Sequence, residues 1–165
     1  MMYQKALLFS DPDVAAKILL ASHPREVKYL GRQVHNFSEP LWHAHREAIV
    51  RKGSLLKFTR PVDREDGWWV GQEGQDLKAM LLGTGERELV EASPMDRIWG
   101  IGFGEAKAGT VGRQKWGLNL LGKALMVVRG ELREADAKEK GEGKEVERNV
   151  EKEGEKGVEE KEEEV

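Results

Sequence analysis

Large apolar side chains stop at Leu132, and this boundary limits how much of the 165-residue chain can build a hydrophobic core. The last aromatic residue is Trp116, and only isolated valines follow Leu132 as large aliphatic residues. Residues 131–165 contain 15 acidic and 8 basic side chains, a net charge of −7, which leaves +4 for residues 1–130. A segment of this composition buries too little apolar surface to offset its chain entropy. We therefore predict one domain over 1–136 and a disordered Glu/Lys/Gly-rich acidic tail over 137–165.

The composition of the whole chain excludes several classes of protein. Because there is no cysteine, disulfides and thiol nucleophiles are excluded, and a reducing compartment is compatible. No apolar run approaches the ~20 residues that a membrane-spanning helix needs. The N-terminus does not have the pattern of a signal peptide. We expect a protein of the cytoplasm or the nucleus that has no membrane partner.

Capping signals mark short helices in the first part of the chain. Asp11 and Pro12 supply an N-cap and a proline at the first helical position, which predicts a helix that ends near Leu20. Pro24 repeats the signal for a short helix, and Gly31 is expected to stop it. These signals predict that the N-terminal region is helical.

Apolar periodicity predicts the remaining elements. Two apolar rows that repeat every seven residues, one of them through Trp42, predict a helix of about 18 residues that starts near residue 40. The other predicted elements are helices over 1–9, 77–82 and 118–132 and a short extended piece over 88–91. The expected fold class is α+β and mainly helical, a single domain with a small sheet.

Residues 61–76 interrupt the helical pattern. They are rich in glycine and polar side chains, which is typical of a loop, yet they contain Trp68 and Trp69. The two indoles either clasp the core or form an exposed patch that binds a partner.

Two carboxylates and an indole lie close together in the sequence. Breaking an N-glycosidic bond develops positive charge on the sugar, which one carboxylate stabilises while a second acid or base moves a proton or positions water. Glu91 and Asp96 are candidates for these roles, and Trp99 is a candidate for stacking on the base or shielding the cation. Asp96 also follows Ser-Pro, so a capping role at a helix start is an equal alternative.

Glycines and one asparagine suggest an anion site. Gly100, Gly102 and Gly104 alternate with other residues in a loop whose backbone N–H groups are able to approach an anion, although a simple tight loop has the same pattern. Asn119 lies near the start of the last predicted helix, where N–H groups favour phosphate. An ordinary N-cap is the alternative for Asn119.

Basic side chains and histidines remain to be assigned. A phosphate clamp needs two or three converging cations, whereas a single one is usually a solvated surface charge. The candidates are Lys5, Arg32, Arg46 and Lys57. His43 and His45 are two residues apart on a predicted helix and point to different faces, so we expect no metal site.

Seven short motifs follow one another along residues 1–132. They are Tyr-Gln-Lys-Ala (3–6), Gly-Arg (31–32), Trp-x-x-x-Arg (42–46), Leu-Leu-Lys-Phe (55–58), Leu-Leu-Gly-Thr-Gly (81–85), Leu-Val-Glu-x-Ser-Pro-x-Asp-x-x-Trp-Gly-x-Gly (89–102) and Asn-x-Leu-Gly-x-x-Leu-Met-x-Val-Arg (119–129). In this order and combined length they resemble the NADAR family, whose YbiA-like members are N-glycosidases.

The resemblance implies an activity and a set of site residues. The activity is hydrolysis, without metal or cofactor, of a phosphorylated ribosylamine intermediate of riboflavin synthesis or of ADP-ribose attached to a nucleobase. A nucleic acid is then a partner only as an ADP-ribosylated substrate. By motif position the catalytic residues are Asp96, Trp99 and Glu91, and the substrate-binding residues are Lys5, Arg32, Trp42, Gly100, Gly102 and Asn119.

One departure from the family pattern affects the expected activity. Family members have a leading strand and a motif glutamate ahead of the helix that carries Tyr-Gln-Lys-Ala, and this sequence starts inside that helix. We therefore expect an N-terminally truncated family member. The alternatives are a non-catalytic fragment that binds ADP-ribose or a nucleotide, and a broken reading frame without a stable fold.

Overall fold

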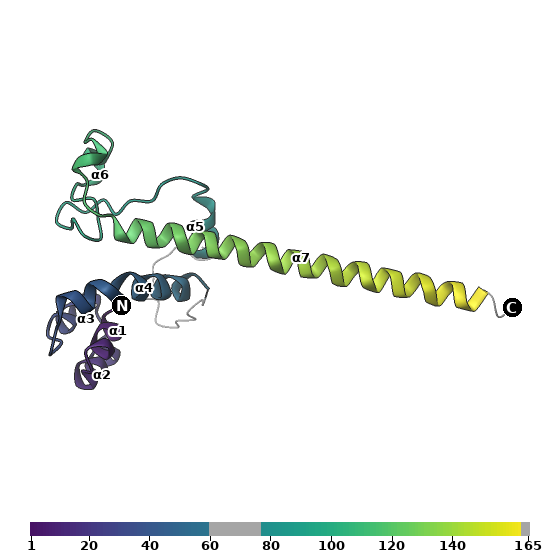
Figure 1. Ribbon diagram of the computed structural model, residues 1–165, viewed down its shortest axis with the longest axis horizontal. Helices are drawn as coiled ribbons and strands as arrows, with labels where there is room; N and C mark the ends of the chain where they lie inside the picture. Colours follow the sequence, from purple (N-terminus) through teal and green to yellow (C-terminus); the bar gives the residue numbers. More distant parts are fainter. Residues whose placement is uncertain (60–76, 163–165) are drawn as a thin grey trace. The chain divides into compact units, whose positions relative to one another are not determined.

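The computed structural model describes the backbone of residues 1–59 and 77–162 and the side chains of residues 1–59 and 77–141 (Figure 1). The predicted loop over 61–76, with Trp68 and Trp69, lies outside the described residues. Within the described ranges every regular element is a helix. None of the helices in this part of the chain is both long enough and apolar enough to cross a membrane.

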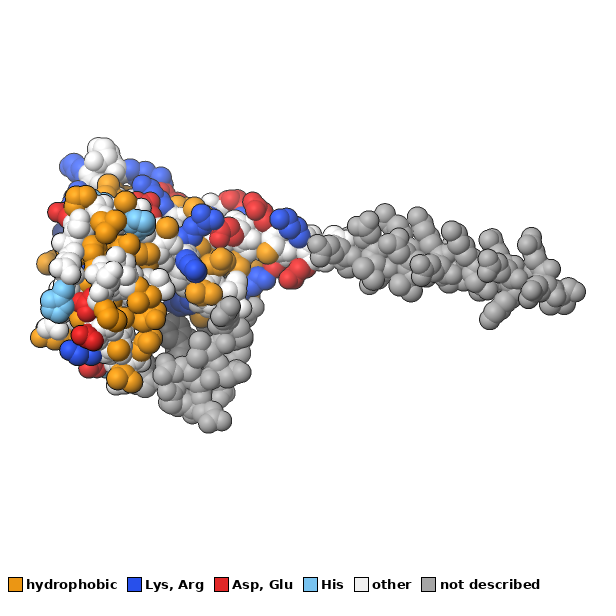
Figure 2. All heavy atoms as spheres, turned by 60° about the horizontal axis from the view of Figure 1, so that its bottom comes forward, with side chains coloured by type: hydrophobic (Ala, Val, Ile, Leu, Met, Phe, Trp, Pro, Cys, Tyr) orange, Lys and Arg blue, Asp and Glu red, His pale blue; other side chains and the backbone are white. Residues whose placement is uncertain are grey.

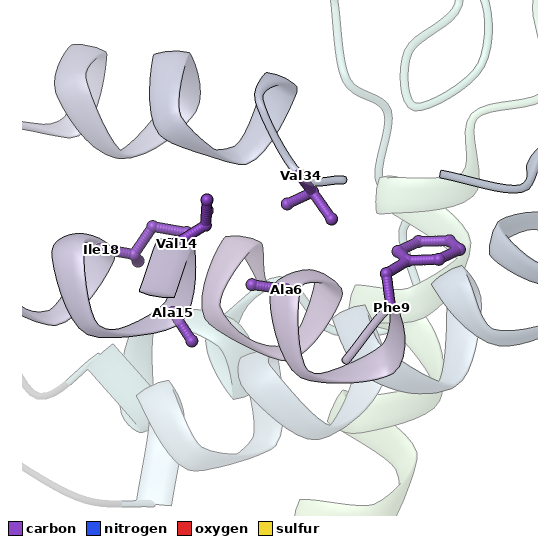
Figure 3. Close-up of a cluster of buried hydrophobic side chains, with 6 residues drawn as sticks. All are labelled: Ala6, Phe9, Val14, Ala15, Ile18 and Val34. Carbon is purple, nitrogen blue, oxygen red and sulfur yellow. The ribbon is translucent and has the colours of Figure 1, made fainter. Parts of the chain in front are cut away.

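Three short helices pack on one another at the N-terminal end. They are α1 (Met2–Leu8), α2 (Pro12–Leu20) and α3 (Pro24–Arg32). Each of the three contacts the other two. The α2 start at Pro12 and the α3 start at Pro24 confirm the predicted proline signals. Their shared core consists of Ala6, Phe9, Val14, Ala15, Ile18 and Val34 (Figure 3).

Gly31 lies inside α3 instead of stopping it. A methyl group on Gly31 would overlap the side chain of Met2 on α1, so the glycine allows the two helices to approach closely. The glycine that the sequence marked as a helix stop is therefore a packing residue, and α3 continues to Arg32.

Asp11 joins the start of α2 to the segment that follows α3. One carboxylate oxygen accepts the N–H of Val14 at 3.1 Å, and the other accepts the N–H of His35 at 2.9 Å and contacts His35 Nδ1 at 2.8 Å. Asp11 is 5 % exposed. The N–H of His35, followed by that of Val14, holds the pKa of Asp11 below its ordinary value. The predicted N-cap is thus also a long-range connection.

Two further helices follow. The predicted long helix is α4 (Glu39–Thr59), which contacts α1, and the predicted short helix is α5 (Leu77–Gly83), which contacts α4. Soon after α5 the chain turns at Gly85, which has a φ of 60° that glycine adopts without strain.

Several large apolar side chains of the N-terminal helices face solvent. Leu19 is 67 % exposed, Leu20 86 % and Tyr29 61 %. On the coloured part of the face in Figure 2, hydrophobic side chains lie among polar and charged ones. The three-helix cluster therefore buries one set of apolar residues and leaves another set in contact with water.

The predicted small sheet is wrong, because no strand is present among the described residues. Residues 84–119 contain only α6 (Glu105–Ala108) and η1 (Arg113–Lys115) between irregular segments. The piece over 88–91 that was expected to be a strand is tied instead by a side chain: Asn119 Nδ2 donates to the carbonyl of Leu89, and Asn119 Oδ1 accepts the N–H of Glu91. These backbone groups are satisfied without a neighbouring strand.

The last helix, α7 (Leu120–Glu162), differs from the expected disordered tail. Compactness divides the chain into one unit of Met1–Val128 and another of Arg129–Val165. Disorder was predicted because the segment buries little apolar surface. Its Glu, Lys, Arg and Ala residues, however, have high intrinsic helix propensity. Glu134 and Asp136 also have a lysine four residues later, a spacing that stabilises a helix. Local propensity thus favours the helix where core packing does not.

Candidate active site

The backbone of residues 97–100 forms hydrogen bonds with the backbone at the start of α7. Its four carbonyl groups accept hydrogen bonds from the four N–H groups of residues 118–121. The N–H groups at a helix start otherwise lack partners. Because these four donate to the protein itself, a phosphate there has to be bound by other groups. The bonds run from Leu118 to Arg97 (2.8 Å), Asn119 to Gly100 (3.2 Å), Leu120 to Ile98 (3.2 Å) and Leu121 to Trp99 (3.1 Å).

Asn119 holds a second segment on this junction. It is 5 % exposed and has a φ of 51°, a conformation that asparagine tolerates better than most residues. Its Oδ1 accepts the N–H of Glu91 at 3.0 Å, and its Nδ2 donates to Leu89 O at 2.9 Å. Both polar side-chain atoms are thus engaged with backbone. These bonds do not test whether Asn119 also contacts the substrate, which stays a prediction.

Asp96 uses one carboxylate oxygen to order its own turn. Its Oδ1 accepts the N–H of Ile98 at 2.9 Å and that of Trp99 at 2.8 Å. The side chain is half-buried, and no residue that the structure describes forms a hydrogen bond to Oδ2. No described helix starts at Asp96, so the helix-capping alternative is not observed. Its side chain orders a turn instead, and this uses only one of the two carboxylate oxygens.

The backbone carbonyls of Glu91 and Asp96 both lie close to Gly100. A methyl group on this buried glycine would lie 2.7 Å from the carbonyl oxygen of Glu91 and 2.9 Å from that of Asp96. The Glu91 carbonyl also accepts the N–H of Ile101 at 3.0 Å, and the Asp96 carbonyl accepts the N–H of Gly102 at 3.0 Å. Both candidate acids therefore belong to one loop, and the side chains of Glu91 and Trp99 are half-buried in it.

The predicted glycines have clear structural roles. Gly102 has a φ of 76°, which side-chain-bearing residues rarely adopt, and a methyl group there would lie 2.7 Å from the Arg97 side chain. Sequence reasoning missed Gly117 and Gly122, whose added methyl groups would overlap the carbonyls of Arg97 and Leu89. A glycine within three residues of Asn119 on each side was the available signal. An anion at the Gly100–Gly102 loop stays a prediction.

Lys5 forms a separate group with two aromatic rings. Its Nζ donates to Gly31 O at 2.7 Å and lies 4.5 Å from the ring centroid of Phe37 and 5.7 Å from that of Trp42. Burial lowers the pKa of Lys5, because desolvation disfavours its charged form. The structure thus brings together Lys5 and Trp42, which were both predicted to bind substrate, and adds Phe37, which was missed.

Arg32 does not join this group. Its side chain is exposed at the end of α3, and no described residue forms a hydrogen bond or ion pair with its guanidinium. Only its neighbour Gly31 takes part, through the carbonyl that Lys5 contacts. The predicted residues therefore fall into a carboxylate group, with Glu91, Asp96 and Trp99, and a cationic group around Lys5. The described residues contain no cluster of three or more His, Asp or Glu side chains that could hold a metal ion.

Comparison with protein families matches residues 1–133 to the NADAR domain. The mimivirus protein named N-glycosidase R617, from Acanthamoeba polyphaga mimivirus, is 43 % identical over 132 residues, which cover 79 % of this chain and 70 % of the relative. N-glycosidase YbiA of Shigella boydii is 33 % identical, covering 79 % of this chain and 67 % of the relative.

A third relative is a much longer protein, of which only a part matches this chain. The chloroplastic riboflavin biosynthesis protein PYRR of Zea mays is 32 % identical over 125 residues, which cover 73 % of this chain and 16 % of the relative. The predicted resemblance is therefore confirmed over residues 1–133. On this match and these identities, the chain belongs to the NADAR family.

Proposed function

We propose that the protein is an N-glycosidase that hydrolyses the bond between C1 of a phosphorylated ribose and a nitrogen atom. The substrate is a phosphorylated ribosylamine or an ADP-ribosylated nucleobase. Family membership and the names of the relatives support the reaction class, and the riboflavin protein from maize supports the first substrate.

The observation that carries this proposal is the geometry of Asp96. Two backbone N–H groups fix Oδ1, so the orientation of the carboxylate is set before a ligand binds. Oδ2 has no protein partner among the described residues, and it is the atom that we assign to the cationic sugar. A positioned negative charge of this kind stabilises an oxocarbenium-like transition state without reorganisation during the reaction.

Glu91 and Trp99 complete the proposed mechanism. Glu91 belongs to the same loop, and we assign it the proton transfer or the activation of the attacking water. Trp99 is half-buried beside Asp96, where an indole face is suited to shield the cation or stack on the leaving base. Lys5 and Trp42 are assigned to substrate binding.

The test replaces the charge and retains the shape. Asp96→Asn preserves an oxygen that can accept the two N–H groups, so the loop is expected to remain folded while turnover falls by about 10²-fold or more. Release of free base and ribose phosphate from both substrate classes is measured by chromatography. Asp13→Asn, at an exposed aspartate of α2, is the control for loss of one negative charge. An Asp96→Asn protein as active as wild type would remove the assignment.

The same assay addresses the alternative of a non-catalytic binding module. Saturable binding of ADP-ribose by wild type, with no release of base from either substrate class, would support that alternative. The grouping of Lys5, Phe37 and Trp42 favours it independently, because a cation beside two aromatic rings can bind a ligand whether or not turnover follows.

A further inference from the structure

Arg46 is a buried cation that has no partner among the residues the structure describes. It lies on α4 and is 8 % exposed. Its Nε atom is buried and has no hydrogen-bond partner, and no described residue forms an ion pair with its guanidinium. Arginine does not lose its proton in proteins, and an uncompensated buried charge is strongly unfavourable. Only its Nε is both fully buried and unpartnered, so the rest of the guanidinium is available to an anion that comes from outside the described residues.

Arg46 shares a helix face with Trp42. The two residues are four apart on α4, so their side chains are neighbours on one face. Val50, four residues further on, is 6 % exposed, which shows that this row of α4 is the buried one. Arg46 is therefore placed by the same buried face that holds the Trp42 indole.

A second cation contacts the same indole. Lys5 Nζ lies 5.7 Å from the Trp42 ring, and its other contacts are the Gly31 carbonyl and the Phe37 ring. Neither Lys5 nor Arg46 is paired with a carboxylate of the described residues. The acids of α4 do not compensate them, because Glu39 and Glu47 are exposed and Glu39 lies 3.6 Å from His43.

We propose that Arg46 and Lys5, which both neighbour Trp42, form a subsite for a phosphate group of the ligand, with Arg46 as its principal anion-binding residue. The guanidinium presents paired donors that match phosphate oxygens bidentately. Lys5 adds a point charge, and the indole offers an apolar face for the attached ribose. Of the four cations that the sequence offered for a phosphate clamp, Arg46 takes the place of Arg32, which the family resemblance had implied. The identity of the phosphate rests on the proposed function, in which the substrate is a phosphorylated ribosyl compound.

The first test uses the sign of a stability change. In phosphate-free buffer, replacing an unpaired buried charge by an apolar side chain of similar volume does not destabilise a protein and often stabilises it. Arg46→Met is therefore expected to have a Tm equal to or above that of wild type. With saturating inorganic pyrophosphate the order is expected to reverse, because only wild type gains stability from the bound anion. A variant that is less stable without any anion would show that Arg46 has a structural partner and overturn the proposal.

The second test measures binding directly. By calorimetry, wild type is expected to bind ribose 5-phosphate and not ribose, and Arg46→Gln is expected to weaken binding at least about tenfold. Arg46→Lys retains the charge without the paired donors and is expected to lose less. Lys52→Gln removes one exposed charge from the same helix and serves as the control. Equal affinity of Arg46→Gln and wild type, or binding of ribose as tight as ribose 5-phosphate, would overturn the proposal.

These measurements separate the subsite from the chemistry, because none of them requires turnover. A protein that binds ribose 5-phosphate through Arg46 and hydrolyses nothing supports the subsite and contradicts the proposed activity. A protein that hydrolyses its substrate with an unchanged KM in Arg46→Gln supports the activity and contradicts the subsite.

Discussion

Asp11 and Asp96 both order a turn with carboxylate oxygens, and they differ in what those oxygens have left to bind. Asp11 uses both oxygens, on Val14 and on His35, and is 5 % exposed. Asp96 uses Oδ1 alone and is half-buried. In sequence the two look alike, since Asp11 lies at a predicted helix start and a helix start was one alternative for Asp96. Only the count of partners distinguishes a carboxylate committed to the fold from one that is available to a ligand.

The largest expected effect is that the two aspartate variants lose different properties: Asp96→Asn loses activity, and Asp11→Asn loses stability. Asp96→Asn is expected to lower kcat by about 10²-fold or more and to leave the Tm nearly unchanged, because Oδ1 can still be replaced by an amide oxygen. Asp11→Asn is expected to lower the Tm by roughly 5 °C or more, because an amide cannot accept at both ends. Its folded fraction should retain wild-type turnover. Thermal melts and turnover per folded molecule give both readouts, and the same response in both variants contradicts the comparison.

The next effect tests the glycine that joins the two candidate acids. In Gly100→Ala the new methyl group would meet the carbonyls of Glu91 and Asp96 at 2.7 and 2.9 Å, which forces the backbone of one of them to move. We expect the free energy of unfolding to fall by about 2 kcal/mol or more and the activity to be lost as well. Gly53→Ala is the matched control, because Gly53 lies within α4 and has nothing within 4 Å of an added methyl group. There helix propensity predicts a gain of about 0.5–1 kcal/mol in denaturant unfolding. Equal effects at the two positions would show that the loop is not closely packed.

The start of the N-terminal region could be predicted from the sequence, because its signals are local. Asp11 caps a helix that starts at the next residue, and the proline at position 12 is itself the signal. The connection of Asp11 to His35 spans 24 residues and has no local signal. The same holds for the Phe37 ring beside Lys5.

The loop that contains Asp96 could be predicted far less well. Its residues were identified from their chemistry and from family motifs, but its structure depends on bonds between Asn119 and the backbone 28 and 30 residues earlier. Residues 88–91 were expected to form a short extended piece, whereas the partner of that backbone is one amide side chain. A pattern of side chains gives no information about which distant group satisfies a given N–H.

A smaller effect is expected at Asn119, and it distinguishes positioning from substrate binding. Asn119→Asp tolerates the φ of 51° and can accept the Glu91 N–H, but it cannot donate to Leu89 O. If Asn119 positions the loop, kcat falls by about tenfold and KM changes little. Asn119→Gly, which retains the backbone conformation and removes both bonds, should lower kcat further. A raised KM with an unchanged kcat would instead assign Asn119 to the substrate, as the sequence had suggested.

The smallest expected effect is on how the free energy of unfolding falls at acid pH, and it again distinguishes Asp11 from Asp96. Hydrogen bonds from His35 and Val14 hold the pKa of Asp11 below its ordinary value of 3.8. A carboxylate whose pKa is lower in the folded state binds fewer protons there than in the unfolded state. Its contribution to stability is therefore complete above the ordinary pKa and is lost as the pH falls through the lowered one.

Urea unfolding of Asp11→Asn between about pH 5 and pH 2 should show a shallower decline in the free energy of unfolding than wild type. Asp13→Asn, which removes an exposed carboxylate from the same helix, should decline as wild type does. If Asp11→Asn and wild type decline in parallel, the two oxygens of Asp11 are not engaged in solution, and its contrast with Asp96 no longer holds.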